Sequence, residues 1–208
     1  MTGPADRPLR LLLADDQALV RGGLAALLDL EPDLEVVAQV GSGTEVAAAV
    51  VEHGVDVALL DIEMPGMDGI ETLEELRARG VDCAVVMVTT FGRPGYLRRA
   101  LAAGAEGFVV KDTPAEALAD AVRRVARRER VVDPTLAVDS LAAGTSPLTP
   151  READVLRAAL TGASVRDMAG ALHLSAGTVR NHLSAAIGKT GTTSRVAAAV
   201  TARDRGWL

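Results

Sequence analysis

Aromatic residues are nearly absent from this chain. Tryptophan, tyrosine and phenylalanine together make up 2% of its 208 residues, whereas hydrophobic residues as a whole make up 49%. That apolar fraction is high enough to bury a core, which argues against a disordered protein. The core must therefore consist of alanine, valine and leucine, in either two small domains or one large domain.

Cysteine is equally scarce. The one cysteine, Cys83, lies inside an apolar run, which excludes a disulfide framework and favours a reducing compartment. No apolar segment reaches the length needed to span a membrane. Residues 1–8 also lack the apolar stretch of a signal peptide. We therefore expect a cytoplasmic protein that has no membrane partner.

Positive charge is in deficit overall, but the deficit is uneven. The net charge is −6, and residues 1–130 account for −8, with 14 Lys and Arg against 22 Asp and Glu. Residues 131–208 carry 8 basic and 6 acidic residues, a balance of +2. This asymmetry indicates that only the second part contacts a polyanion.

Short apolar runs alternate with segments of helical periodicity in residues 1–130. The expected strands cover residues 9–14, 34–40, 57–61, 84–89 and 107–110, and the expected helices cover residues 17–30, 44–52, 68–79, 94–103 and 114–128. Asp68 and Thr113 are the expected N-caps of capping boxes with Glu71 and Glu116. The alternation predicts an α/β domain with a doubly wound parallel sheet, and its size favours the flavodoxin-like strand order 2-1-3-4-5.

Residues 131–146 are expected to be a linker because they combine proline, glycine and serine. Residues 147–208 are expected to form a small all-helical domain, with helices at residues 150–160, 164–172, 176–189 and 193–205. Thr149, Ser164 and Ser175 are the expected N-caps of the first three, and Glu152 is expected to complete a capping box with Thr149. Short helices joined by a tight turn are typical of a helix-turn-helix unit.

Polar side chains follow four of the expected strands. Asp15 and Asp16 follow the first, Asp61 ends the third, Thr89 ends the fourth and Lys111 follows the fifth. Parallel strands end at one edge of the sheet, where such folds bind ligands. Clustered carboxylates favour Mg²⁺, which also accepts phosphate oxygens, and no loop has calcium-binding spacing.

Asp61 can then act as a nucleophile that accepts a phosphoryl group, with Lys111 pairing with the phosphate oxygens and the Thr89 hydroxyl bonding to one of them. Taken singly, these signals are weaker. An acidic pair after a strand is often a loop or a helix cap, a single lysine is more often a surface residue, and a single threonine indicates nothing. Their combination, in this order along the chain, indicates phosphoryl transfer.

Residues 9–128 resemble the receiver domain of two-component response regulators. The resemblance rests on Asp15-Asp16, on Asp61 with the Met-Pro-Gly-Met-Asp-Gly motif at residues 64–69, and on Thr89 and Lys111. It implies the following roles: Asp61 as phosphoacceptor for a histidine kinase, Asp15 and Asp16 as metal-site acids, the Glu63 backbone carbonyl as a further metal ligand, Thr89 as switch hydroxyl, Phe108 as switch aromatic and Lys111 as phosphate-binding lysine.

Residues 147–208 resemble the DNA-binding domain of the LuxR/NarL/FixJ family. The resemblance rests on residues 148–152, on Thr-Val-Arg-Asn-His at residues 178–182 and on Lys189. It implies that residues 175–189 form the recognition helix. In this helix, Arg180, Asn181 and Ser184 are expected to contact bases, and Thr178 and Lys189 are expected to contact DNA phosphates. His182 is expected either to contact a phosphate or to pack in the core.

Together the two resemblances imply a response regulator transcription factor, not an enzyme. Phosphorylation of Asp61 would favour a homodimer, with the first and last receiver helices as one plausible interface, and this dimer would bind double-stranded promoter DNA. Residues 91–96 and 206–207 are similar to regulators of the DesR kind.

Two alternatives remain open. One is a DNA-binding regulator that acts independently of phosphorylation. The other is an aspartyl-phosphate phosphohydrolase, which typically needs a second aspartate two positions after the nucleophile, where this chain has Glu63.

Overall fold

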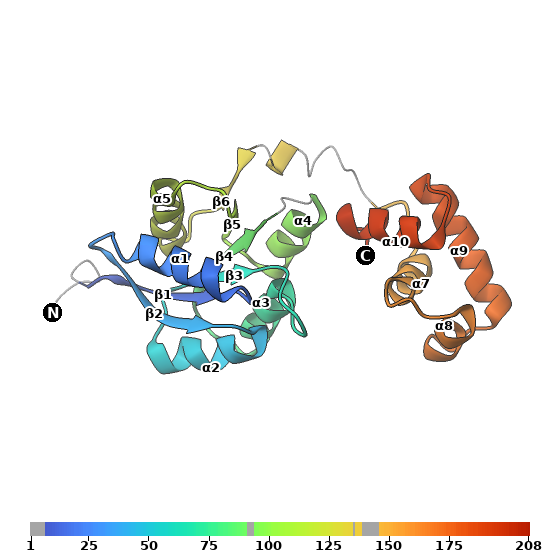
Figure 1. Ribbon diagram of the computed structural model, residues 1–208, viewed down its shortest axis with the longest axis horizontal. Coiled ribbons are helices and arrows are strands. Elements are labelled where there is room, and N and C mark those ends of the chain that lie inside the picture. The colour runs from blue at the N-terminus through green and yellow to red at the C-terminus, as the bar shows by residue number, and fades with distance from the viewer. Residues whose placement is uncertain (1–6, 91–93, 135, 139–145) are drawn as a thin grey trace. The chain divides into compact units, whose positions relative to one another are not determined.

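The computed structural model describes residues 7–90, 94–134, 136–138 and 146–208 (Figure 1). Residues 91–93 of the DesR-like stretch lie outside these ranges. The chain divides into two compact units, one built mostly from the residues up to Leu136 and one mostly from Ala137 onward. Among the described residues, no helix has both the length and the apolar character that crossing a bilayer requires.

A parallel sheet of six strands forms the centre of the first unit, in the order β2-β1-β3-β4-β5-β6. The strands are β1 (Leu9–Ala14), β2 (Leu34–Val40), β3 (Val57–Asp61), β4 (Ala84–Thr89), β5 (Gly107–Val110) and β6 (Val131–Val132). The predicted fold class and the predicted order of the first five strands are confirmed. Asp61 lies opposite Val88, and Thr89 lies opposite Val110, so these strands end at the same edge.

The sixth strand was not predicted. Val131 and Val132 pair in parallel with Gly107 and Phe108, although the sequence placed both valines at the start of the linker. The Val131 N–H donates to the carbonyl of Glu106 at 2.9 Å. Two β-branched residues next to the open edge of β5 extend the sheet at little conformational cost, because their side chains already favour extended backbone.

Helices cover both faces of this sheet (Figure 1). α1 and α5 pack on one face, where they share a core with strand residues such as Leu13, Leu59 and Val86. Successive strand residues point to opposite faces, so the buried Leu12 and Leu60 lie on the other side, which α2 and α3 cover. The helices that alternate with the strands are α1 (Ala18–Leu28), α2 (Gly43–His53), α3 (Gly69–Ala78), α4 (Pro94–Ala103) and α5 (Ala115–Ala126).

Two predicted helix starts have different outcomes. The capping box at α3 is confirmed, because Asp68 Oδ1 accepts the Glu71 N–H at 2.7 Å and Glu71 Oε2 accepts the Asp68 N–H at 2.9 Å. The box predicted at Thr113 is wrong. Pro114 is the N-cap of α5, and no side chain caps that helix. The Thr113 N–H instead donates to the Val110 carbonyl at 3.0 Å, in the turn that leaves β5.

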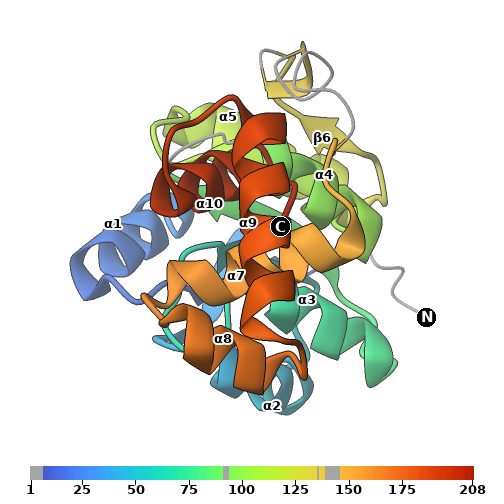
Figure 2. The same cartoon turned by 90° about the vertical axis from the view of Figure 1, so that its right-hand side faces the viewer.

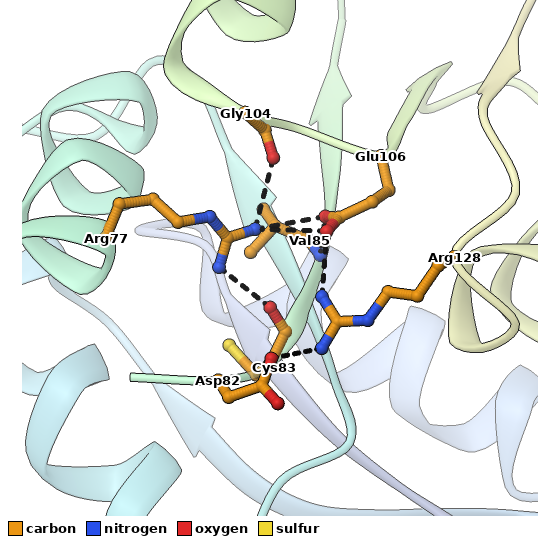
Figure 3. A network of polar contacts seen from close by, with 7 residues as sticks. All are labelled: Arg77, Asp82, Cys83, Val85, Gly104, Glu106 and Arg128. Carbon is orange, nitrogen blue, oxygen red and sulfur yellow. Dashed lines mark hydrogen bonds and ion pairs between the residues drawn. The ribbon is translucent and has the colours of Figure 1, made fainter. Parts of the chain in front are cut away.

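Glu106 lies at the centre of a polar network at the amino-terminal ends of β4 and β5 (Figure 3). Its carboxylate accepts the Val85 N–H at 2.8 Å and forms ion pairs with Arg77 at 3.1 Å and Arg128 at 2.9 Å. Arg77 also donates to the Cys83 carbonyl at 2.9 Å. The network ties α3 and the residues after α5 to the starts of two strands, at the edge opposite the strand ends that carry Asp61 and Thr89.

The second unit is helical, as predicted. Its helices are α7 (Pro150–Leu160), α8 (Val165–Ala171), α9 (Ala176–Thr190) and α10 (Arg195–Asp204). Thr149, Ser164 and Ser175 cap the first three, as the sequence predicts, and Ser194 caps α10. A short turn joins α8 to α9, the arrangement of a helix-turn-helix (Figure 2).

The core of the helical unit consists mainly of aliphatic residues. Leu156 of α7, Met168 of α8, and Val179 and Leu183 of α9 are buried in one cluster, and Trp207 packs against it. This burial leaves the opposite side of α9 exposed, and that side carries the residues that the sequence associates with DNA.

Candidate functional site

Polar side chains from several strands meet at the carboxyl-terminal edge of the sheet. Lys111, which follows β5, lies with its Nζ 2.7 Å from Oδ2 of Asp15 and 3.0 Å from Oδ2 of Asp61. Asp15 follows β1 and Asp61 ends β3, so the lysine side chain reaches across β4. The structure thus brings three of the predicted site residues into direct contact.

Burial makes the electrostatics of this cluster strong. Asp15 and Asp61 are each 3% exposed. Burial raises the pKa of Asp61 above its ordinary value, and Lys111 opposes this rise only in part. Burial alone would lower the pKa of Lys111, but the carboxylates of Asp15 and Asp61 outweigh it and the lysine pKa is raised. Lys111 therefore stays charged and compensates part of the negative charge of the two buried acids.

A third acid completes the cluster. Asp16 is exposed, and one carboxylate oxygen from each of Asp15, Asp16 and Asp61 lies within 4.8 Å of the other two. An all-oxygen donor set of three carboxylates is what hard divalent cations take. The positive charge of Lys111 alone does not neutralise three acids. The composition and spacing of this cluster are consistent with a metal site.

Thr89, Phe108 and Glu63 are the remaining residues of the predicted receiver site. Thr89 and Phe108 are fully buried, at 0% exposed. The carbonyl of Thr89 accepts the Lys111 N–H at 2.8 Å, which links the ends of β4 and β5. Phe108 lies in β5 opposite Met87. Glu63 is exposed in the loop that follows β3, two residues after Asp61.

The loop after β3 holds Asp61 in place through close backbone packing. Gly66 has a φ of +83°, a conformation that favours glycine. The Gly69 N–H donates to the Ile62 carbonyl at 3.1 Å. A Cβ on Gly69 would lie 2.2 Å from the Asp61 carbonyl oxygen, so a side chain at this position would displace the end of the strand. The backbone geometry of this loop thus explains why both positions of the 64–69 motif, Gly66 and Gly69, are glycine.

Sequence reasoning missed Arg21. This residue of α1 donates from Nη1 to the backbone carbonyl of Asp15, and it lines a small cavity together with Asp15 and Asp61. It therefore fixes the segment that carries Asp15. A signal was present, because Arg21 is the single charged residue within α1, and a lone charge on an otherwise apolar helix needs a nearby partner.

The predicted DNA-contacting residues lie mostly on the exposed side of α9. Arg180, Asn181 and Ser184 are exposed. They lie on one side of the helix, because Ser184 comes four residues after Arg180 and three after Asn181, and positions three and four apart are neighbours on a helix surface. Thr178 and His182 are half-buried.

Lys189 differs from these residues. It lies in the last turn of α9 and forms an ion pair with Glu152 of α7 at 2.7 Å. Sequence reasoning identified Glu152 only as the partner of the Thr149 cap and did not connect it with Lys189.

Two family models match the chain, one for each unit. Residues 11–123 match the response regulator receiver domain, and residues 146–202 match the luxR family of bacterial regulatory proteins. The first match contains every predicted residue of the acidic cluster. The second contains α7, α8, α9 and most of α10.

Individual relatives agree with these matches. The transcriptional regulatory protein YvfU of Bacillus subtilis is 41% identical over 96% of this chain and 100% of its own length. The transcriptional regulatory protein DesR of the same organism is 39% identical over 96% of this chain and 99% of its own length, which confirms the predicted DesR-like character. The crystal structure of the response regulator ChrA, from a heme-sensing two-component system, has a TM-score of 0.60 at 34% identity and covers 97% of this chain and 99% of its own.

YvfU and DesR are transcriptional regulatory proteins and ChrA is a response regulator, which sets the phosphohydrolase alternative aside. The match extends over both units and nearly the whole length of the relatives. The chain belongs to the LuxR/NarL family of two-component response regulators, and it is a transcription factor with a receiver domain and a LuxR-type DNA-binding domain, not an enzyme.

Proposed function

We propose that Asp61 is the phosphoacceptor of this response regulator and that a sensor histidine kinase supplies the phosphoryl group. The observation that carries the proposal is the contact of the buried Asp61 carboxylate with Lys111 Nζ at 3.0 Å, beside two further acids. A buried acid paired with one lysine at a strand end has the parts that accept and hold a phosphoryl group.

The chemistry at Asp61 follows from these parts. A carboxylate oxygen of Asp61 attacks the phosphorus of a phosphohistidine, the P–N bond breaks, and its electron pair returns to the imidazole, which takes up a proton. Lys111 then pairs with the phosphoryl oxygens, and the Thr89 hydroxyl donates to one of them. Thr89 and Phe108 serve as the switch, since movement of Thr89 toward the phosphoryl group would leave space for the Phe108 ring.

We propose Mg²⁺ as the cation of the acidic cluster. Asp15, Asp16, Asp61 and the backbone carbonyl of Glu63 would hold it, and when bound it would neutralise the charge that three acids and a phosphoryl group bring together. Among these ligands Asp16 is the exposed acid, so it can change without leaving a cavity in the core.

Incubation of the protein with acetyl phosphate tests this proposal. With Mg²⁺, intact mass spectrometry should find a single added phosphoryl group, and with excess EDTA it should find none, because three acids would repel the incoming phosphate. Asp16→Asn should shift the Mg²⁺ concentration for half-maximal labelling upward. Equal labelling with and without the chelator would contradict the assignment of the cluster.

The proposed DNA target is a promoter duplex, with α9 in its major groove. Arg180 and Asn181 are suited to base edges, since arginine reads guanine and asparagine reads adenine with paired hydrogen bonds. Ser184 lies one turn further along the same face, while Thr178 and His182 flank it at positions suited to backbone phosphates. The receiver domain would cover residues 1–130, the linker residues 131–146 and the DNA-binding domain residues 147–208, with β6 formed by the first two residues of the linker.

We propose that phosphorylation favours a homodimer through α1 and α5, with a second copy of this chain as the occupant of the exposed α1 surface. Leu19, Leu27 and Leu30 are 90%, 46% and 77% exposed, which is unusual for three leucines within one helix and the residues that follow it. Exposed charged residues of the neighbouring α5 and its C-cap, such as Glu116 and Arg127, can form the polar rim.

Sedimentation of the full chain with and without beryllofluoride and Mg²⁺ checks this dimer. The unmodified chain should sediment as a monomer at micromolar concentration and the beryllofluoride-treated chain as a dimer. Leu19→Glu should abolish the dimer because it places a charge in the apolar surface, whereas Val51→Glu, a matched change at an exposed valine of α2, should not. Dimers that form equally well with Leu19→Glu would rule out this interface.

The remaining alternative is a regulator that acts without phosphorylation. Such a receiver is expected to lose one of its acids, the threonine or the lysine, and this chain retains all of them. We therefore favour the phosphorylation-dependent mechanism, in the cytoplasm, where both the kinase domain and promoter DNA are accessible.

A further inference from the structure

Lys189 contacts protein where contact with a DNA phosphate was expected. Its Nζ lies 2.7 Å from Oε2 and 3.0 Å from Oε1 of Glu152. Glu152 is 5% exposed, and its Oε2 also accepts the Thr149 N–H at 2.7 Å. The lysine ammonium thus faces both oxygens of a buried carboxylate, and it is the cation that balances that charge.

The pair joins the ends of two helices. Glu152 lies in the first turn of α7, where the helix dipole favours a negative charge, and Lys189 lies in the last turn of α9, where the dipole favours a positive charge. Further along, α7 and α9 pack through buried aliphatic residues, among them Leu156 and Val179. The ion pair is therefore the polar end of the contact that holds α9 on α7.

We propose that Lys189 is a positioning residue, which fixes the angle of α9 through Glu152, and that it is not a phosphate contact. The proposal rests on the proposed role of α9 in reading DNA. Arg180 lies nine residues before Lys189, or about 13 Å along the helix axis. A change of angle at the Lys189 end therefore moves the base-facing end by the greater amount.

Loss of the lysine would produce such a change. Without Lys189, the carboxylate of Glu152, which is 5% exposed, has no cation beside it. Separation of the start of α7 from the end of α9 would bring water to this carboxylate and so lower the cost of leaving it unpaired. A second substitution, at Glu152, should therefore restore the operator affinity that replacement of Lys189 removes. If Glu152 is made neutral at the same time, no unpaired charge remains and the two helices can stay packed.

The test compares Lys189→Met, Glu152→Gln and the double variant in the full chain. An operator duplex is first selected from a random library with the wild-type chain, and affinity for this operator and for a random duplex is then measured over a salt series. Lys189→Met should lose at least about tenfold in operator affinity and less on random DNA, and its slope of log K against log salt should match that of wild type. The double variant and Lys189→Arg should recover most of the loss.

A phosphate contact gives a different pattern. The salt slope of Lys189→Met would then fall by about 0.9, operator and random duplex would lose the same factor, and the double variant would bind as weakly as Lys189→Met. That pattern would overturn the proposal.

Thermal unfolding guards against a variant that fails to fold. The effects of the two substitutions on the melting temperature are expected to be coupled, so that the double variant melts above Lys189→Met. Additive losses in melting temperature would contradict the proposal. A wild-type chain without preference for any operator would instead overturn the role of α9 itself, and this inference with it.

Discussion

Replacement of Asp61 by asparagine is expected to abolish phosphorylation of the chain. The amide has nearly the same shape as the carboxylate but is not a nucleophile toward phosphorus, and no other acid ends β3. Intact mass after incubation with acetyl phosphate and Mg²⁺ should therefore show no added phosphoryl group. Asp112→Asn, a matched change in the exposed acid that follows Lys111, should be labelled like the wild type. Persistent labelling of Asp61→Asn at another residue would refute the assignment.

The same substitution should raise the melting temperature in the absence of Mg²⁺. The pKa of Asp61 is raised above its ordinary value by burial, so the folded state holds the proton more tightly than the unfolded state. The ionised form of Asp61 therefore destabilises the folded state. This destabilisation is absent below pH 3.8, the ordinary pKa of an aspartate, and it grows as the pH rises from there through the raised pKa. The difference in melting temperature between Asp61→Asn and wild type should accordingly be larger at pH 7 than at pH 4.

Arg180→Ala is expected to weaken binding of the selected operator by roughly 1–3 kcal/mol, about 5- to 150-fold, and to relax specificity at one base pair. The physical reason is that a guanidinium on the exposed face of α9 can make two hydrogen bonds to a guanine, which alanine cannot replace. Fluorescence anisotropy with the operator and with single-base variants measures both effects.

Arg157→Ala is the matched control for this experiment. Arg157 is an exposed arginine of α7 that pairs with Asp154, so its loss removes the same charge from the same unit without touching α9. It should change operator affinity by less than about threefold. Equal losses in the two variants would mean that Arg180 contributes charge alone and does not read a base.

Much of the fold was predictable because local signals and the tertiary structure agree. The alternation of apolar runs with helical periodicity gave the parallel sheet, and short polar side chains marked most helix starts. The acidic cluster was predictable for a related reason. Parallel strands end at one edge, so Asp15, Asp61 and Lys111 had to lie near one another once the strand order was known.

The features that sequence reasoning missed depend on contacts between distant segments. β6 is a strand because β5 offers an open edge, and two valines alone carry too little signal to predict it. Thr113 is drawn into the turn after β5, which leaves Pro114 as the N-cap. The pairing of Lys189 with Glu152 joins residues 37 positions apart, and no local pattern records it.

The most direct test of the whole account is the affinity of the full chain for its selected operator before and after phosphorylation of Asp61. We expect acetyl phosphate with Mg²⁺ to raise that affinity by at least about tenfold, because a phosphorylated dimer presents two DNA-binding domains to adjacent half-sites at a raised effective concentration. The Asp61→Asn variant should show no increase. Equal affinity of the phosphorylated and unphosphorylated wild-type chains would contradict the account and favour a regulator that acts without phosphorylation.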